Sequence, residues 1–150
     1  MTSPDAAPDA LPSRPAVPRP QPETDSLDEV YWTSGRSGAL RLARCRDCRY
    51  WINPPSPVCP SCLSRHVADE PVSGRGTLWT YTVNMHPWSG AFPVPWPAGL
   101  VELVEQDGLR ILGPIVGVPP EEIAIGMELT LDFEQRGDVY VPVFVRGDHD

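Results

Sequence analysis

CRDCRYWINPPSPVCPSC, residues 45–62, contains all four cysteines of the 150-residue chain, in two C-x2-C pairs around a proline-rich turn. Two residues between cysteines allow both sulfurs of a pair to point the same way from one tight turn, and two such turns complete a tetrahedron around a metal ion. We therefore predict a metal site at Cys45, Cys48, Cys59 and Cys62. Disulfides are the alternative, but paired C-x2-C motifs without an export signal favour metal.

Zinc is the expected metal, because thiolates are soft ligands and the spacing suits a tetrahedral site; iron is the alternative. Four thiolates close the coordination shell, whereas a catalytic zinc commonly keeps three protein ligands and an open position. We therefore expect a structural site whose binding free energy stabilises the fold. Glycine often follows the second cysteine of such a turn, but Arg49 and Leu63 stand there, which predicts a less regular turn.

The net charge of −8 is unevenly distributed along the chain. Residues 36–65 hold six arginines and one aspartate, a formal charge of +5, whereas residues 66–150 hold four arginines and thirteen acids, a formal charge of −9. Lysine is absent, so every cationic side chain is a guanidinium, suited to bidentate contacts with carboxylates and phosphates. The cysteine segment is basic, and the rest of the folded chain is acidic.

The first 25 residues include seven prolines and no aromatic residue, which predicts a disordered Pro/Ala-rich tail. The start MTSPDAAPDALPSRP has neither the basic region nor the apolar run of a signal peptide, and no segment is long enough for a membrane span. We therefore expect a cytoplasmic protein without a membrane contact. Ser26 and Glu29 fit a capping box, which predicts a short docking helix over 26–36 with Gly35 as its stop.

The remaining chain has the pattern of a small β protein. We predict a strand over 40–44, a zinc ribbon over 37–66, a barrel over 67–146 and an acidic tail over 147–150. The strands expected in the barrel cover residues 67–72, 78–86, 99–105, 109–116, 127–134 and 139–145, with a helical turn at 118–123. Five or six short strands interrupted by one small helix predict an OB-fold. An immunoglobulin-like sandwich is the alternative, but it normally needs about seven strands.

Aromatic and arginine side chains supply the candidate contacts with a partner. The segment 86–97 is unusually apolar for a connection, which indicates that it packs against something. A histidine at a strand end, such as His86, is more often packed or hydrogen-bonded than a catalytic base. The candidate contacts with a partner are Tyr31, Trp32, Arg46, Arg49, Trp51, His86, Trp88, Phe92 and Trp96. We predict no catalytic residue.

Over about residues 27–146 the chain resembles the zinc-ribbon OB-fold proteins, long catalogued as a domain of unknown function, that are encoded beside thiolase-like enzymes. The resemblance is carried by YW at 31–32, LRL at 40–42, CRDC at 45–48, PPSPVCPSC at 54–62 and SGRGTL at 73–78. It continues through YTVN at 81–84, VEL at 101–103, IGM at 125–127 and PVF at 142–144. The resemblance implies a rubredoxin-like zinc ribbon followed by an OB barrel.

The same resemblance implies a non-catalytic accessory subunit that binds a thiolase-superfamily acyl-CoA enzyme. It makes the aromatic and arginine side chains named above candidate contacts with that enzyme or with its acyl-CoA. The stretch YTVNMHPW at 81–88 is similar to a subgroup that accompanies aldolases in steroid side-chain breakdown, so steroid or lipid degradation is the implied pathway. Two alternatives remain. A nucleic-acid-binding protein is disfavoured by the acidic barrel, which repels phosphates, and a rubredoxin-like electron carrier requires iron at the four cysteines.

Overall fold

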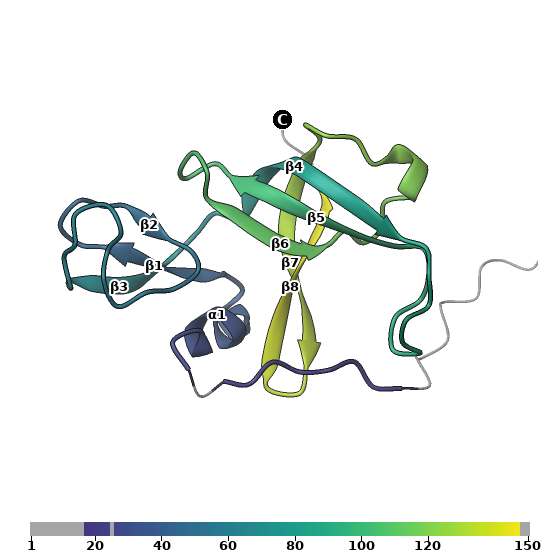
Figure 1. The fold of residues 1–150 in the computed structure, drawn as a ribbon, viewed down its shortest axis with the longest axis horizontal. Helices are drawn as coiled ribbons and strands as arrows, with labels where there is room; N and C mark the ends of the chain where they lie inside the picture. Colours follow the sequence, from purple (N-terminus) through teal and green to yellow (C-terminus); the bar gives the residue numbers. More distant parts are fainter. Residues whose placement is uncertain (1–16, 25, 148–150) are drawn as a thin grey trace, which may run out of the picture.

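The computed structural model describes residues 17–24 and 26–147 (Figure 1). It contains a short helical segment, a three-stranded sheet that carries the cysteines, and a five-stranded sheet that curls into a barrel. The elements are α1 (Glu29–Thr33), η1 (Ser34–Ser37), β1 (Arg41–Cys45), β2 (Trp51–Ile52), β3 (Val67–Pro71), β4 (Arg75–Asn84), β5 (Trp96–Leu103), β6 (Arg110–Pro114), η2 (Pro120–Glu122), β7 (Glu128–Arg136) and β8 (Val139–Arg146). The predicted fold class of helix, ribbon and OB barrel is confirmed.

The small sheet, which we call the ribbon sheet, has the order β2-β1-β3 and is antiparallel throughout. Residues 67–72 are predicted as a barrel strand, but β3 pairs with β1 along its whole length, from Arg41–Pro71 to Cys45–Val67. The chain therefore leaves the ribbon sheet only after residue 71. Nothing in the local sequence of β3 distinguishes the two possible partners.

The large sheet has the order β6-β5-β4-β7-β8, and all its neighbours are antiparallel. Its two outer strands meet where Ile115 forms a parallel bridge with Phe144, and the Val116 N–H donates to the Phe144 carbonyl at 2.8 Å. Buried and half-buried residues alternate without a break along β5, as expected for a strand with one face in a core. This closure makes a barrel rather than two stacked sheets, which excludes the sandwich.

One hydrophobic core serves both the barrel and part of the ribbon. Phe144, Leu78 and Leu129 are completely buried inside the barrel, and Leu40 and Trp51 of the ribbon side pack into the same cluster. A fully buried side chain of this size stabilises the fold by about 1.5–3 kcal/mol. The cysteine end has only a small cluster of its own, formed by Ala43, Cys45, Ile52 and Cys59 with Val67 beside it. A metal held by the four cysteines would therefore add to the stability of that end.

The helical segment forms, but without the predicted capping box. The Ser26 hydroxyl donates to the side chain of Asp28, whose other oxygen accepts from Trp32 Nε1 at 2.9 Å. These two hydrogen bonds lower the pKa of Asp28. Asp28 is the N-cap residue, and no side chain caps the backbone there. The helix thus begins two residues later than the capping box at Ser26 and Glu29 requires.

Gly35 does not stop the helix as predicted. It is buried in η1, and a Cβ atom there would lie 2.5 Å from Tyr140 Cβ and 2.6 Å from Phe133 Cδ1. The segment ends instead at Gly38, which has a φ of 82°. The role of Gly35 is therefore a close approach between the helical segment and the hairpin of β7 and β8.

Residues 17–24, which we call the N-terminal strap, differ from the tail predicted over 1–25. The strap runs along the turn of β7 and β8 and on toward the loop between β4 and β5 (Figure 1). Arg19 Nη1 lies 2.6 Å from Glu134 Oε2, and Arg136 Nη1 donates to the Pro20 carbonyl at 3.1 Å. The rest of the predicted tail, residues 1–16 and 25, and residues 148–150 of the acidic tail lie outside the described residues.

Within residues 17–24 and 26–147, the structure contains no helix with the length and apolar character of a membrane span.

Candidate functional site

The four cysteine sulfurs lie within 4.8 Å of one another at one end of the ribbon sheet. Cys45 Sγ is 3.6 Å from Cys62 Sγ, and Cys48 Sγ is 3.6 Å from Cys59 Sγ. A tetrahedral tetrathiolate site with metal–sulfur bonds of about 2.3 Å places its sulfurs about 3.8 Å apart. The observed spacing therefore fits a four-coordinate metal site, and all four predicted ligands come together.

The pKa values of the cysteine thiols also favour a cation at this site. The backbone N–H of Cys48, 3.5 Å from Cys45 Sγ, is the main reason why the pKa of Cys45 falls to about 6. The backbone N–H of Ser64 lowers the pKa of Cys62, but the neighbouring thiols and burial outweigh it and raise that pKa to about 12. Four sulfurs at this spacing cannot all become anionic without a positive ion between them. The donor set is closed, with two buried and two exposed cysteines.

The two cysteine turns share one backbone geometry. Arg49 and Leu63, the residues directly after the second cysteine of each pair, have φ values of 67° and 62°. Each donates its N–H to the carbonyl of the first cysteine, Arg49 to Cys45 at 3.1 Å and Leu63 to Cys59 at 2.9 Å. The prediction that the missing glycines make the turns less regular is therefore wrong. Both turns keep the left-handed residue, at a steric cost of roughly 1–2 kcal/mol each.

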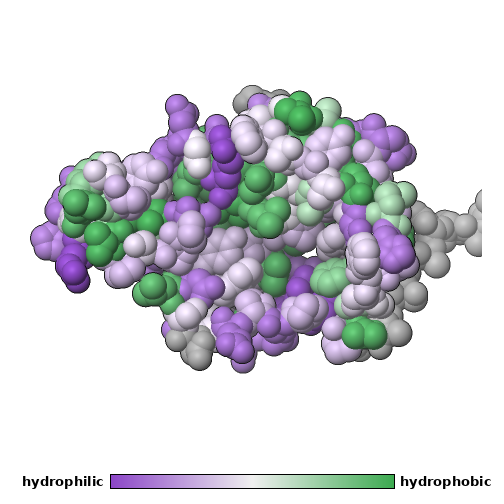
Figure 2. Space-filling view, in the orientation of Figure 1, coloured by the Kyte–Doolittle hydropathy of each residue, from purple (hydrophilic) through white to green (hydrophobic). Residues whose placement is uncertain are grey.

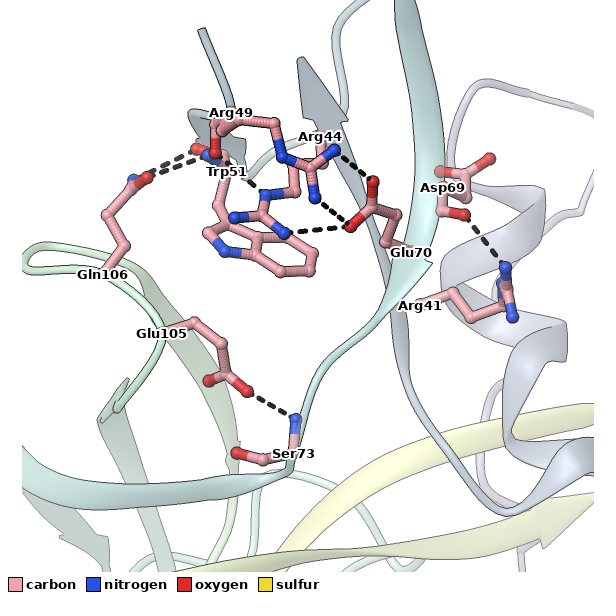
Figure 3. A network of polar contacts seen from close by, with 9 residues as sticks. All are labelled: Arg41, Arg44, Arg49, Trp51, Asp69, Glu70, Ser73, Glu105 and Gln106. Carbon is pink, nitrogen blue, oxygen red and sulfur yellow. Dashed lines mark hydrogen bonds and ion pairs between the residues drawn. The ribbon is translucent and has the colours of Figure 1, made fainter. Parts of the chain in front are cut away.

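Arginines near the site are engaged with a carboxylate of β3. Glu70 accepts from Arg44 Nη1 at 2.9 Å and from both terminal nitrogens of Arg49, at 2.8 and 3.0 Å (Figure 3). These hydrogen bonds, with Arg49 the stronger cause, lower the pKa of Glu70. The Arg44 guanidinium also lies over the Trp51 ring, 4.4 Å from its centre. Arg49 is thus half-exposed and paired, whereas Arg46 is exposed.

Polar side chains of the barrel fix the ribbon in place. Gln106 accepts from the Trp51 N–H at 2.8 Å and donates to the Trp51 carbonyl at 3.1 Å (Figure 3). Asn53 Nδ2 donates to the Arg110 carbonyl at 2.9 Å, and Glu105 accepts from the Ser73 N–H at 2.5 Å. A groove of about 240 Å³ lies along this seam, between the segment 50–60 and the turn at 106–109. Ribbon and barrel are therefore joined by specific polar contacts as well as by the core.

Three of the predicted contact residues lie in the interior or at its edge. Trp51 is 5% exposed and belongs to the main core. Tyr31 packs against the same core, and burial raises its pKa. Trp32 is half-buried, with its ring edge-on to Tyr31 at 4.7 Å between centres. These three residues dock the helical segment and the ribbon against the chain itself.

The other aromatic candidates come together on one surface loop, residues 85–95, which we call the aromatic loop. Trp88 is 80% exposed and packs edge-on against His86, with 4.4 Å between ring centres. Phe92 packs on Trp96, the first residue of β5, at 5.3 Å. Trp88, Phe92 and Trp96 line an apolar groove of about 310 Å³ together with Asn84 and Ser89.

The outer face of β4, β5 and β6 forms a second exposed apolar area. Trp79 is 48% exposed and Leu112 is 67% exposed. Arg110 lies over the Trp79 ring at 3.7 Å and is itself paired with Glu102 at 2.9 Å, so this face has little net charge. Figure 2 shows hydrophobic side chains gathered over this part of the barrel. Sequence patterning did not single out these residues, because one exposed tryptophan in a strand carries no distinctive spacing.

Histidines and serines near the metal site do not form a nucleophile–base pair. The Ser64 hydroxyl donates to Asp47 Oδ2 at 2.5 Å, and His66 Nδ1 contacts the same carboxylate at 3.1 Å. In a catalytic triad the histidine accepts from the serine and the acid orients the histidine. Here Asp47 bonds to both, so Ser64 has no base.

Comparison with known proteins agrees with this architecture. Residues 32–68 match the model of the ChsH2 rubredoxin-like zinc ribbon domain, and residues 69–134 match that of the ChsH2 C-terminal OB-fold domain. A solved structure titled "Ltp2-ChsH2(DUF35) aldolase" superposes with a TM-score of 0.76 at 31% identity, over 84% of this chain and 98% of that one. The chain belongs to the ChsH2-type DUF35 family.

Relatives of this DUF35 chain have two kinds of name. A DUF35 domain-containing scaffold protein of Pyrococcus furiosus is 38% identical over 67% of this chain and 74% of its own length. A probable enoyl-CoA hydratase alpha subunit of Thermomonospora curvata is 35% identical over 87% of this chain. The chain spans 41% of that hydratase subunit's length. Other relatives are named scaffold proteins or a thiolase subunit.

Several residues that organise this DUF35 structure escape sequence reasoning. Asn84 stands at the end of β4 and contacts both His86 and Trp88. Arg19 and Glu134 pair across 115 positions, and Gln106 reaches Trp51 across 55. Asn84 carries a usable signal, since asparagine at a strand end often organises a turn. The long-range pairs carry none, because their partners are adjacent only after folding.

Proposed function

We propose that this chain is a non-catalytic accessory subunit of a thiolase-superfamily acyl-CoA enzyme, a thiolase, acyl-CoA synthase or aldolase. The observation that carries the proposal is the closed tetrathiolate site at the end of a ribbon that polar contacts fix to an OB barrel. Such a site has no open position for substrate, so the metal's role is to hold the fold. The names of the relatives supply the acyl-CoA context: an enoyl-CoA hydratase alpha subunit, a benzoylsuccinyl-CoA thiolase subunit and an aldolase.

The proposed metal is Zn²⁺, with iron as the alternative. Cys45, Cys48, Cys59 and Cys62 would hold it, and it would supply cross-linking of the two cysteine turns rather than chemistry on a substrate. Metal analysis of protein produced in medium containing both metals separates the alternatives. Zinc near one ion per chain in colourless protein supports the proposal, whereas a visible iron–thiolate absorbance supports the electron carrier.

Nothing in the described residues favours independent catalysis. His86 packs against an exposed tryptophan, and His66 is 75% exposed and paired with Asp47. Neither contacts a serine or cysteine placed as a nucleophile. The acidic barrel also disfavours nucleic acid, because phosphate binding needs cationic surface. The placement of the histidines and the acidic charge of the barrel therefore both favour an accessory function.

Co-expression tests the proposal directly. The tagged chain is expressed with each thiolase-superfamily enzyme encoded in the same genome, and the captured complexes are resolved by size. Retention of one such enzyme at fixed stoichiometry supports the proposal. A Cys48→Ser/Cys62→Ser variant, which breaks the metal site, should lose the enzyme. A chain that stays alone with every candidate contradicts the proposal.

The proposed pathway is the breakdown of steroid or other lipid side chains. Its support is the resemblance of residues 81–88 to the aldolase-associated subgroup, together with the structural match to the Ltp2-ChsH2(DUF35) aldolase. Activity of the captured complex is measured on short-chain acyl-CoA substrates and on acyl-CoA substrates with a steroid side chain. The comparison shows which of these two substrate classes the complex uses. Turnover of short-chain substrates alone would contradict the steroid assignment and leave the accessory role intact.

A further inference from the structure

The aromatic loop is an apolar surface segment without a charged side chain. Its sequence, MHPWSGAFPVP, contains no acid and no arginine. Trp88 projects from it at 80% exposure and lines one side of the groove, and Phe92 and Trp96 line the same groove. An exposed tryptophan beside an apolar groove is typical of a protein-interaction hot spot.

Asn84 orders the exposed end of the loop before any partner arrives. Its side-chain oxygen accepts from Trp88 Nε1 at 3.2 Å and from the His86 N–H at 3.4 Å, and its amide donates to the His86 carbonyl at 3.0 Å. The His86 ring then supports the indole from the side. A tryptophan held in one orientation loses less conformational entropy on binding. The loop is thus preorganised.

Arg19 of the N-terminal strap orders the other end of the loop. Its guanidinium lies over the Trp96 ring at 4.8 Å and near the Phe92 ring at 5.6 Å, and its Nε donates to the Ala91 carbonyl at 3.2 Å. Glu134 fixes the guanidinium from behind at 2.6 Å and is held in turn by Arg136 at 2.9 Å. One side chain therefore connects the aromatic groove to the hairpin of β7 and β8.

We infer that the aromatic loop is a preorganised docking site for an apolar side-chain cluster of a protein partner, held in its binding conformation by the N-terminal strap through Arg19. This inference rests on the proposed function and names the surface that meets the enzyme. Arg19 is a positioning residue, because it acts through Phe92 and Trp96. Trp88 is the anchor.

The charge of the barrel indicates which kind of molecule binds the aromatic groove. Residues 73–147 hold nine acids and four arginines, a formal charge of −5, and the charge of Arg19 is compensated by Glu134. The loop therefore offers an uncharged groove on an acidic barrel, which repels the phosphates of coenzyme A. The surface that fits is an apolar cluster with a basic rim, presented by a protein. Binding should accordingly weaken as salt screens the rim charges.

The test compares Trp88→Ala and Arg19→Ala with two controls in the full chain. Trp79→Ala removes an exposed tryptophan from the other apolar face, and Arg65→Ala removes an exposed arginine outside the strap. Hydrogen exchange of residues 85–95 is measured without partner, and affinity is measured for the enzyme that co-purifies with the unmodified chain. Zinc content reports on folding, and decanoyl-CoA is titrated against the enzyme-free chain.

We expect Trp88→Ala to weaken enzyme binding about tenfold or more with unchanged exchange in the barrel. Arg19→Ala should accelerate exchange across residues 85–95 about tenfold and weaken binding by a similar factor, while both controls bind normally. The inference is overturned if Trp88→Ala and Arg19→Ala bind as well as the unmodified chain, or if only Trp79→Ala weakens binding. In those cases the proposed function stands and the docking surface lies elsewhere.

Two further outcomes are decisive. Binding of decanoyl-CoA to the enzyme-free chain, abolished in Trp88→Ala, would overturn the protein occupant in favour of a thioester. If no enzyme binds the unmodified chain, the proposed function fails and the docking assignment fails with it. Unchanged exchange of residues 85–95 in Arg19→Ala overturns the positioning role of the strap in either case.

Discussion

The side-chain amide of Gln106 pairs with the backbone of Trp51 as a neighbouring strand would. It accepts the Trp51 N–H at 2.8 Å and donates to the Trp51 carbonyl at 3.1 Å. One barrel side chain thus completes the open edge of β2 and fixes the angle at which the ribbon meets the barrel. This contact adds to the hydrophobic core that the ribbon and the barrel share.

Replacing Gln106 with alanine leaves both Trp51 backbone groups without a protein partner at a half-buried edge. We expect the free energy of unfolding to fall by about 1–2 kcal/mol, with faster hydrogen exchange at Trp51. Denaturant titration with exchange measurement checks both. Gln135→Ala is the control, because its amide makes one exposed bond, to the Gly137 carbonyl. Equal losses in the two variants would contradict the bridging role of Gln106.

Leu63 tests the geometry of the cysteine turn. It has a φ of 62° and is 76% exposed, so Leu63→Gly removes a backbone strain and sacrifices little packing. We expect the free energy of metal binding to become more favourable by about 1 kcal/mol, which is roughly fivefold tighter binding. Competition with a chromophoric chelator measures this affinity. Leu63→Val should bind metal more weakly, because a β-branched residue tolerates this φ poorly. A weaker site in Leu63→Gly would show that the strain account is wrong.

Gly35 tests the contact between the helical segment and the barrel. A Cβ at this position would meet Tyr140 and Phe133 at 2.5–2.6 Å, so Gly35→Ala should destabilise the fold by about 1–3 kcal/mol. Gly117→Ala is the matched control, since nothing lies within 4 Å of its added Cβ and only its φ of 70° opposes the change. Thermal unfolding of both variants separates steric overlap from backbone strain. A neutral Gly35→Ala contradicts the close approach.

Glu134 should make part of the stability depend on pH. Burial raises its pKa, but hydrogen bonds from Arg136 and Arg19 outweigh burial, so its pKa in the folded chain lies below the ordinary value of 4.5. Such a carboxylate contributes its stabilisation above the unfolded pKa and loses it as the pH falls through the folded pKa. We therefore expect a loss that begins near pH 5 and grows toward pH 3.

In Glu134→Gln, the free energy of unfolding should no longer fall through protonation of residue 134 as the pH is lowered. It should still fall through release of the metal. The measurement is the difference in urea midpoint between Glu134→Gln and the unmodified chain at several pH values. The difference should shrink as the pH falls. A constant difference across the range is inconsistent with a strap held by an ionised Glu134.

Sequence reasoning succeeded where the signal is local. The spacing of the cysteines specifies the metal site, because a C-x2-C turn places both sulfurs by itself. Turn residues and alternating hydrophobicity locate every barrel strand to within a few residues, since each strand buries one face. The single small helix between strands then separates an OB barrel from a sandwich.

It failed where distant segments decide the outcome. The pairing of β3 with β1 depends on which strand edge is free after folding. The anchoring of Arg19 by Glu134 and of Trp51 by Gln106 has no local signature. The capping box failed for a local reason, because Asp28 rather than Ser26 is the N-cap residue and Glu29 is the first residue of the helix. Arg49 adopts a left-handed backbone, with a φ of 67°, at a position that usually takes glycine, and residue preference alone does not predict this.

The central claim is that the chain completes an acyl-CoA enzyme without performing its chemistry. The most direct measurement is the turnover of the co-purifying thiolase-superfamily enzyme, purified alone and then reconstituted with this chain in stoichiometric amounts. The account predicts low or unstable activity alone, restoration by the zinc-loaded chain, and no restoration by Cys48→Ser/Cys62→Ser. Full activity of the enzyme alone, unchanged when the chain is added, would contradict it.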